Sequence, residues 1–135
     1  MNINRSIILV GSNVKPYTGL KNAGQALKEI DPSLQSLPES LSPDVNHPGK
    51  APYLNQLFLL HTSLGAEELT ARFKIMEKKL GRRPEDKQKG TVVIDIDLVW
   101  FNDQLLKPFE AKIPYVQEGV ENFAQKIEHY GLVHP

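Results

Sequence analysis

Two aspartates in the second half of the chain are the residues whose spacing most directly suggests chemistry. Asp95 and Asp97 alternate with apolar residues in T-V-V-I-D-I-D-L-V-W-F, a segment that spans residues 91–101 and predicts a strand. Side chains two apart on a strand share a face, so both carboxylates are expected on one face, with Cα atoms about 6–7 Å apart. The other face is expected to be apolar and to carry Val92, Ile94, Ile96, Leu98 and Trp100.

Adjacent carboxylates of this kind repel one another unless a cation lies between them. Hard oxygen ligands at this spacing suit one or two magnesium ions that are bound mainly by the phosphates of a substrate. The alternative is that Asp95 and Asp97 are solvated, or pair with Lys and Arg side chains of a neighbouring element. The spacing alone leaves both interpretations open.

Glu77 stands in the last turn of a helix predicted over residues 67–80, where a negative charge opposes the helix dipole. Its position therefore needs another explanation. Neutralisation by Lys74, Lys78 or Arg82 is the simplest one.

Tyr53 and Asn55 lie two residues apart in a strand predicted over residues 53–62. On a strand they share a face, where an aromatic ring beside an amide suits a flat heterocycle. The alternative is sheet packing together with a hydrogen bond to a turn.

Two polar segments are predicted to be loops. Residues 82–90, R-R-P-E-D-K-Q-K-G, contain no apolar side chain and have two more basic than acidic residues. A mobile loop of this composition could close over phosphate, or could simply be solvated. Residues 42–52, S-P-D-V-N-H-P-G-K-A-P, form the second predicted loop.

The remaining elements must position these residues. Residues 6–10 predict a buried strand that ends in the polar turn Gly11-Ser12-Asn13. Apolar residues at helical spacing predict a helix that follows this turn and ends at Asp31-Pro32. The further expected elements are a strand near residues 34–41 weakened by Pro38, an extended piece over residues 112–115, and a helix over residues 119–128.

Length and composition limit the classes of protein that fit. The chain has 135 residues, which predicts a single domain over residues 1–135. Sixteen basic and sixteen acidic residues cancel, so neither nucleic acid nor an anionic membrane surface is an expected partner. The absence of cysteine and of long apolar runs favours a cytoplasmic protein. A monomer is expected, although the sequence does not determine the oligomeric state.

Four short motifs occur in an order that resembles a known family. G-S-N at residues 11–13, P-Y-L-N at 52–55, E-x-x-x-G-R at 77–82 and I-D-I-D-L at 94–98 resemble 6-hydroxymethyl-7,8-dihydropterin pyrophosphokinase. The resemblance covers roughly residues 5–123. Each motif is weak by itself, but the ordered set is specific.

The resemblance implies an α+β, ferredoxin-like α/β/α sandwich with a mainly antiparallel sheet. It also implies transfer of diphosphate from ATP to the pterin hydroxymethyl group in folate biosynthesis, with release of AMP. By similarity, Asp95 and Asp97 would hold two magnesium ions, Tyr53 and Phe123 would enclose the pterin, and Asn55 would hydrogen-bond it. The residues implied on the ATP side are Glu77 at the nucleotide and Arg82 at the phosphates, with Lys87 and Lys89 as further basic candidates.

Three positions depart from the pattern of this family, and all three fall on the side of the site that is expected to bind the ATP phosphates. Val92 and Glu121 stand where the family typically has arginine, and Tyr115 stands where it typically has histidine. Lys87, Lys89 or Lys112 could replace the missing positive charge. Two alternatives to the enzyme follow: a non-catalytic relative that binds a pterin or nucleotide, and an interaction domain with a decayed site.

Overall fold

The structure is a computed structural model that describes residues 3–42, 49, 51–108 and 110–133. For Lys87 and for residues 126–133 it describes the backbone alone. Most of the loop predicted over residues 42–52 therefore lies outside the described residues.

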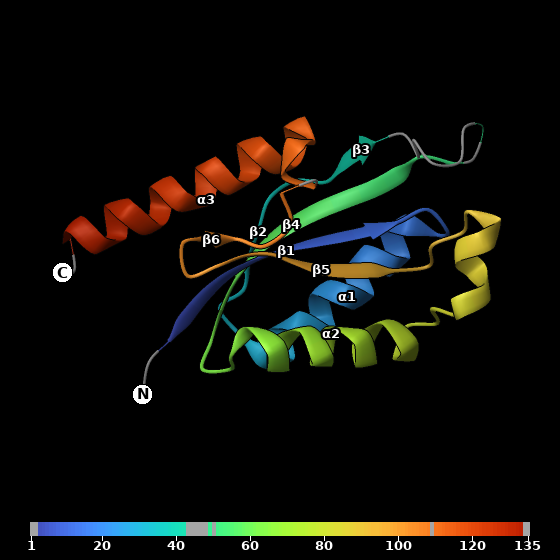
Figure 1. Cartoon of the computed structure of the whole chain (residues 1–135), viewed down its shortest axis with the longest axis horizontal. Coiled ribbons are helices and arrows are strands. Elements are labelled where there is room, and N and C mark those ends of the chain that lie inside the picture. The colour runs from blue at the N-terminus through green and yellow to red at the C-terminus, as the bar shows by residue number, and fades with distance from the viewer. Residues whose placement is uncertain (1–2, 43–48, 50, 109, 134–135) are drawn as a thin grey trace.

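An antiparallel sheet forms the centre of the molecule (Figure 1). In the described residues its strand order is β2-β4-β1-β5-β6, and β3 pairs with the other part of the β4 edge. The bounds are β1 Asn4–Ser12, β2 Gln35–Ser36, β3 Ser40–Ser42, β4 Tyr53–Thr62, β5 Asp95–Phe101 and β6 Gln104–Leu105. With a helix after β1 and another after β4, the chain follows the β-α-β-β-α-β order of a ferredoxin-like fold.

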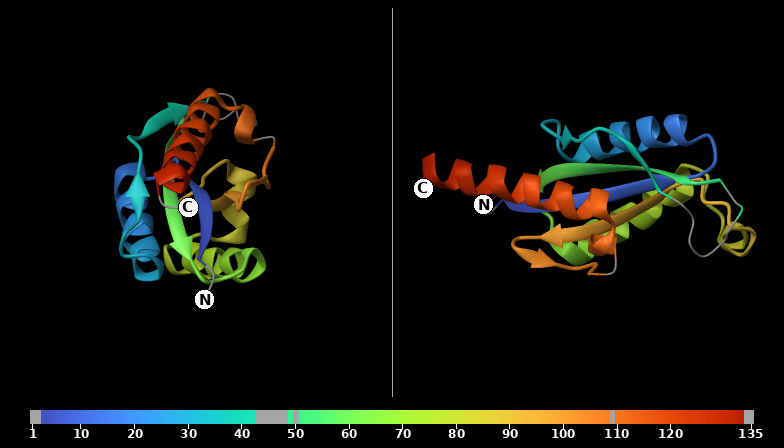
Figure 2. Two further views of the ribbon diagram at one scale, coloured as in Figure 1. Left: turned by 90° about the vertical axis from the view of Figure 1, so that its left-hand side faces the viewer. Right: turned by 90° about the horizontal axis from the view of Figure 1, so that it is seen from above.

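The helices cover the two faces of this sheet (Figures 1 and 2). Helices α1, Pro16–Ile30, and α2, Ala66–Lys79, lie on one face, and α3, Pro114–Val133, lies on the other. Two short 3-10 helices, η1 at Pro84–Lys89 and η2 at Glu110–Lys112, complete the described elements. The predicted α/β/α sandwich is therefore confirmed.

Each face of the sheet has its own apolar core. On the first face, Ile8 and Val10 of β1 pack with Leu69 and Phe73 of α2. On the second face, the core of α3 and the sheet consists of Ile7, Leu9, Leu57, Leu59, Val99, Trp100, Val116 and Phe123. The alternation along β1 thus divides a continuous apolar run between two cores.

One prediction about β5 is wrong because the strand contains a bulge. Ile8 lies opposite Leu98 whereas Ile7 lies opposite Trp100, so Val99 has no counterpart on β1. An extra residue reverses the faces of all residues beyond it. Trp100 therefore packs in the core under α3 instead of sharing the face of Ile94, Ile96 and Leu98.

The other predicted elements fare differently. The strand over residues 53–62 and the helix near residues 67–80 are confirmed as β4 and α2. The weak strand is divided at Pro38 into β2 and β3, and the predicted loop at residues 82–90 contains η1. The extended piece over residues 112–115 is wrong, because η2 ends there and α3 begins at Pro114.

Gly119 provides a test of how closely α3 packs on the sheet. A Cβ atom at Gly119 would overlap Cδ1 of the fully buried Leu57 and lie 3.1 Å from Cδ1 of Leu37. Gly119→Ala is therefore expected to lower the free energy of unfolding by about 1–3 kcal/mol, as overpacking does. Urea denaturation measures the change.

Gly24 in α1 is the matched control for this substitution. A Cβ atom there would meet only Phe58, at 3.6 Å, which is ordinary contact. Gly24→Ala should instead raise the free energy of unfolding by about 0.5–1 kcal/mol, because alanine favours the helix. Equal effects of the two substitutions would contradict the close packing of α3.

Candidate functional site

One rung of the sheet brings the predicted site residues together. Gly11 of β1 lies opposite Asn55 of β4 on one side and opposite Asp95 of β5 on the other. Directly opposed residues point to the same face of an antiparallel sheet. Asn55 and Asp95 therefore share the face covered farther along by α3, about two strand spacings or 10 Å apart. Tyr53 and Asp97 lie on this face as well, each two residues along its strand.

The structure explains why the G-S-N motif begins with a glycine, Gly11. A Cβ atom at this position would come within 3.1 Å of Asn55 Oδ1. The lack of a side chain keeps the sheet surface low between Asn55 and Asp95. The rung thus has a polar group at each side and a flat floor between them.

Asn55 itself is held in a defined orientation. The side chain is buried, and Nδ2 donates a hydrogen bond to Ser42 Oγ at 2.7 Å. Ser42 lies on β3, opposite Tyr53. The amide that the sequence singled out is thus fixed beside a half-buried aromatic ring.

Asp95 and Asp97 form an electrostatically coupled pair. Burial raises the pKa of Asp97 to about 7, and the negative charge of Asp95 acts in the same direction. Burial would also raise the pKa of Asp95, but hydrogen bonds from Asp97 and Arg82 outweigh it, and the net shift is downward. As the pH falls, Asp97 therefore takes up a proton before Asp95, and Asp95 is the member that keeps its charge.

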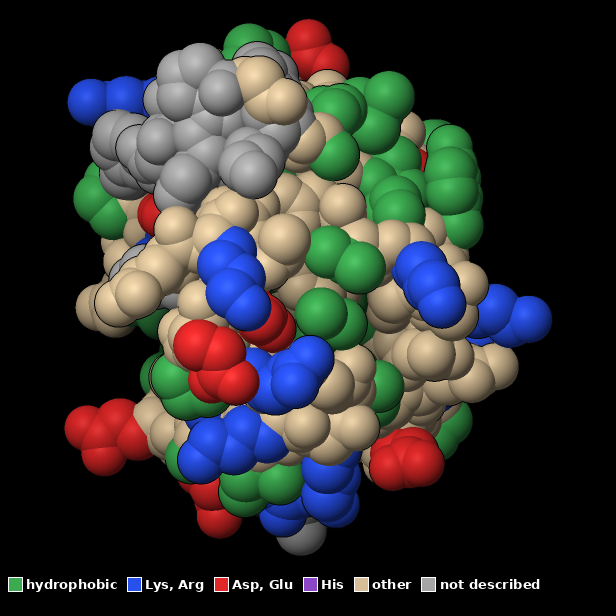
Figure 3. Space-filling view, turned by 90° about the vertical axis from the view of Figure 1, so that its right-hand side faces the viewer, with side chains coloured by type: hydrophobic (Ala, Val, Ile, Leu, Met, Phe, Trp, Pro, Cys, Tyr) green, Lys and Arg blue, Asp and Glu red, His purple; other side chains and the backbone are tan. Residues whose placement is uncertain are grey.

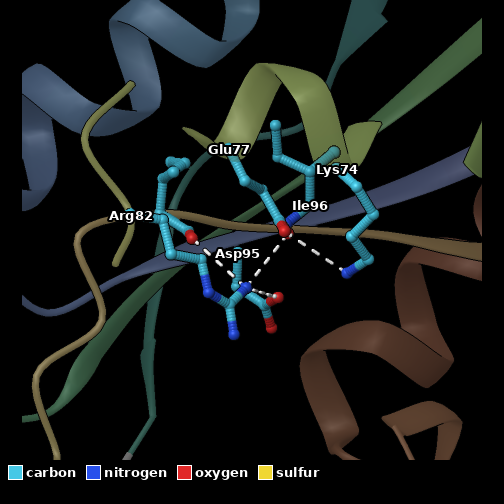
Figure 4. Close-up of polar contacts among 6 residues, drawn as sticks. Lys74, Glu77, Arg82, Asp95 and Ile96 are labelled. Carbon is cyan, nitrogen blue, oxygen red and sulfur yellow. Dashed lines mark hydrogen bonds and ion pairs between the residues drawn. The ribbon is translucent and has the colours of Figure 1, made fainter. Parts of the chain in front are cut away.

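A chain of ion pairs connects Asp95 to α2 (Figure 4). Arg82 Nη1 donates to Asp95 Oδ1 at 2.7 Å and lies 3.1 Å from Glu77 Oε2. Glu77 Oε1 in turn lies 3.3 Å from Lys74 Nζ. Neutralisation of Glu77 by Lys74 and Arg82, one of the sequence interpretations, is therefore present in the structure.

Glu77 is also buried, with 3% of its surface exposed, and burial is the largest cause of its raised pKa. The resemblance implied a contact of Glu77 with the nucleotide, and this remains a prediction. The carboxylate that would make such a contact is occupied by donors from the protein itself.

The acid pair supplies some of the oxygen ligands that a hard divalent cation needs, but not a complete set. Arg82 occupies Oδ1 of Asp95, yet the Asp95 side chain is still 38% exposed. Two carboxylates that repel each other favour a cation between them. In the described part of the chain no group of three or more His, Asp or Glu side chains could hold a metal. The donor set thus suits a metal that receives most of its ligands from a substrate.

Besides Arg82, two basic residues that the sequence did not single out for phosphate act on the acid pair. Lys74 of α2 and Lys107 after β6 both lower the pKa of Asp97 through their charge. In the sequence, Lys74 was recognisable only as a neighbour of Glu77. The position of Lys107 relative to Asp97 depends on how the β5-β6 hairpin folds back. Lys89 and Lys112, which the sequence did propose, are exposed on η1 and η2. The side chain of Lys87 lies outside the described part.

The surface at this end of the molecule carries charges of both signs. Figure 3 shows acidic and basic side chains next to one another on the visible described surface, without a broad basic area. The cancellation of charge in the sequence is thus also local.

Phe123, the second predicted pterin contact, lies in the core under α3. Phe123 is fully buried and packs in the same cluster as Leu9 and Leu57. Leu9 and Leu57 lie opposite one another on the sheet, two residues along from Gly11 and Asn55 and on the same face. Stacking of Phe123 on a ligand stays a prediction, and it requires the ring to become exposed.

The basic segment at residues 82–90 is anchored at both ends. Arg82 binds Asp95 at its start, and Asn13 holds its end. The Asn13 side chain accepts a hydrogen bond from Val92 N at 2.7 Å and donates one to Gly90 O at 2.9 Å. The last residue of the G-S-N motif thus connects this segment to the turn after β1.

Tyr115, one of the three departures, has a structural role. Between β2 and β3, Pro38 interrupts the edge that pairs with β4. The Tyr115 hydroxyl accepts a hydrogen bond from Leu57 N at 3.1 Å and donates one to Pro38 O at 2.6 Å. It therefore completes the pairing that the proline breaks, while Glu121 is exposed and Val92 half-buried.

The two aspartates should affect stability in opposite directions. The pKa of Asp97 is raised from its ordinary value near 4 to about 7, so the native state binds more protons than the unfolded state between these values. Its carboxylate thus costs stability as the pH rises through this window. At pH 8, Asp97→Asn should raise the free energy of unfolding by about 1 kcal/mol, and the gain should vanish near pH 4.

Asp95→Asn is the matched comparison at the same pH. The pKa of Asp95 is lowered, so its charge stabilises the fold above its ordinary pKa and is lost only in acid. This substitution should lower the free energy of unfolding by about 1 kcal/mol, since Arg82 loses one of its two carboxylate partners. Denaturant titrations at pH 8 and pH 4 measure both, and shifts of the same sign at pH 8 would refute the assignment.

Tyr115→Phe tests the structural role of the hydroxyl. The substitution leaves the Leu57 N–H without its acceptor and should lower the free energy of unfolding by about 1–3 kcal/mol. Tyr17→Phe is the control, because Tyr17 is 70% exposed and should change stability by less than about 0.5 kcal/mol. If both variants unfold at the urea concentration of the parent protein, the two hydrogen bonds of the Tyr115 hydroxyl do not contribute to stability.

Comparison with known proteins adds the final observation. The family model for 7,8-dihydro-6-hydroxymethylpterin-pyrophosphokinase matches residues 7–127. The chain is similar to 2-amino-4-hydroxy-6-hydroxymethyldihydropteridine pyrophosphokinase of Helicobacter pylori, with 28% identity over 116 residues that cover 83% of this chain and 71% of the relative. It is also similar to the protein of the same name from Pseudomonas putida, with 27% identity over 113 residues that cover 82% of this chain and 93% of the relative. The match includes β4, β5, α1 and α2 and extends into α3, and the chain therefore belongs to the 7,8-dihydro-6-hydroxymethylpterin-pyrophosphokinase family.

Proposed function

We propose that this chain transfers diphosphate from ATP to 6-hydroxymethyl-7,8-dihydropterin and releases AMP, a reaction of folate biosynthesis. The observation that carries the proposal is the rung Asn55-Gly11-Asp95. It sets a polar group suited to a heterocycle and an acid pair suited to metal-bound phosphate on one sheet face.

The pterin would lie at the β4 side of this rung. Tyr53 offers an aromatic surface, and Asn55 offers a carbonyl oxygen whose orientation is set by the bond from Nδ2 to Ser42. A flat ring with hydrogen-bonding edges matches this combination. Gly11 leaves room for the ring to extend toward β5.

The phosphates of ATP would lie at the β5 side. Asp95 and Asp97 are the residues that would hold magnesium, and magnesium would neutralise the phosphate charge. Lys74 and Lys107, which act electrostatically on Asp97, are the basic residues best supported as further phosphate contacts. Arg82 is already engaged with Asp95 and would first orient that carboxylate.

In the proposed step the pterin hydroxymethyl oxygen forms a bond to the β-phosphorus of ATP. The bond between that phosphorus and the oxygen bridging to the α-phosphate breaks, AMP leaves with the bond electrons, and the hydroxyl proton passes to solvent. The protein contributes by holding the two reactants in line and by balancing charge, as in other phosphoryl transfers.

The test measures AMP after incubation of the protein with magnesium, millimolar ATP and the hydroxymethyl dihydropterin. AMP should form above background, and Asp95→Asn and Asp97→Asn should each lower the rate at least about a hundredfold, as expected when charge stabilisation of a transition state is lost. Omission of magnesium should have the same effect.

Asp103→Asn is the matched control, since Asp103 lies in the exposed turn of the same hairpin. Its φ of 70° is a conformation that asparagine also tolerates, so rate and stability should be unchanged. Absence of AMP would contradict the catalytic proposal. If calorimetry then showed pterin binding without ATP binding, the protein would be a non-catalytic pterin binder.

A further inference from the structure

The part of β5 that carries the two aspartates is an edge of the sheet. In the described residues β6 pairs with β5 only at Trp100 and Phe101. On its other side β5 pairs with β1 from Asp95 to Phe101, with an interruption only at the bulge at Val99. The outer backbone groups near Asp95 and Asp97 therefore need partners other than a strand.

Glu77 supplies that partner for the residue between the two aspartates. Its Oε2 atom accepts a hydrogen bond from Ile96 N at 2.7 Å. The same oxygen lies 3.1 Å from Arg82 Nη1, which binds Asp95. A single carboxylate thus contacts the backbone of the acid pair and the guanidinium that balances it (Figure 4).

Fold stability alone does not account for a carboxylate at this position. Glu77 is almost completely buried and stands in the last turn of α2, where the helix dipole disfavours negative charge. Well-packed apolar residues often replace buried ion pairs without loss of stability. What an apolar residue cannot do is accept a hydrogen bond from Ile96 and hold Arg82 against Asp95.

We propose that Glu77 is a positioning residue, which holds Ile96 and Arg82 so that Asp95 and Asp97 keep their spacing on the sheet face, and that it does not contact the nucleotide. Its oxygens are occupied by Ile96, Arg82 and Lys74, and 3% exposure leaves no surface for a ligand. The catalytic part of this inference rests on the proposed pyrophosphokinase activity, whereas the structural part does not.

Two substitutions separate the two functions of the carboxylate. Glu77→Gln keeps an oxygen acceptor for Ile96 but removes the charge that faces Arg82 and Lys74. Glu77→Leu removes both. Glu68→Gln, in the exposed first turn of the same helix, is the control and should behave like the parent protein.

The first measurement is hydrogen exchange of the Ile96 amide by NMR on the metal-free protein, with the amides of the central strand β1 as reference. Glu77→Leu should speed exchange at Ile96 at least about tenfold relative to β1, whereas Glu77→Gln should stay within about threefold. Unchanged relative exchange in Glu77→Leu would overturn the proposal, whether or not the protein proves to be an enzyme.

The second measurement is the kinetics of AMP formation. Both variants should lower kcat, Glu77→Leu by at least about tenfold, with the KM for ATP within about twofold of the parent value. A raised KM for ATP at unchanged kcat would indicate a nucleotide contact and overturn the proposal. A parent protein that forms no AMP would instead refute the proposed function, while the exchange result would still decide the positioning role.

Discussion

The repulsion between Asp95 and Asp97 is the interaction around which the rest of the site is arranged. Their position two residues apart on an edge strand keeps both carboxylates on one face. The protein offsets only part of the resulting negative charge. Arg82 binds Asp95, whereas Asp97 has a pKa raised to about 7 by burial and by its neighbour. The pair is thus left in need of a cation, which is the property expected of a site that binds metal together with phosphate.

The contacts that maintain this pair come from outside its own strand. Glu77 of α2 binds the backbone at Ile96, and Asn13 of the turn after β1 binds the backbone at Val92. Glu77 thus holds the outer side of β5 at a point where the described residues provide no neighbouring strand, and Asn13 holds the segment that leads into β5. The G-S-N motif begins on β1 with Gly11, whose missing side chain leaves the surface low between the acid pair and Asn55. The G-S-N motif thus joins the two halves of the site.

The departures from the family pattern do not all have the same meaning. Tyr115 completes an interrupted sheet edge, so its hydroxyl is used inside the fold. Glu121 places an exposed negative charge on α3, and Val92 contributes its backbone to the bonds with Asn13. Basic residues near Asp97 come instead from Lys74 and Lys107. Positive charge toward the acid pair is therefore supplied from α2 and the hairpin, at different positions from those of the family pattern.

Local patterns in the sequence predicted β4, α2 and the paired carboxylates, because alternation and helical periodicity act over neighbouring residues. The sequence did not predict the bulge at Val99, which depends on the pairing of β5 with β1 and moves Trp100 to the other core. It also did not predict Lys107 near Asp97 or the burial of Phe123, since both depend on how distant elements pack. An NMR titration of the Asp95 and Asp97 carboxyl carbons, with and without magnesium and ATP, tests the central claim most directly. Without ligand, Asp97 should titrate near pH 7 and Asp95 below its ordinary value, and magnesium with ATP should lower the pKa of Asp97. Ordinary pKa values for both residues, unaffected by magnesium and ATP, would contradict the account.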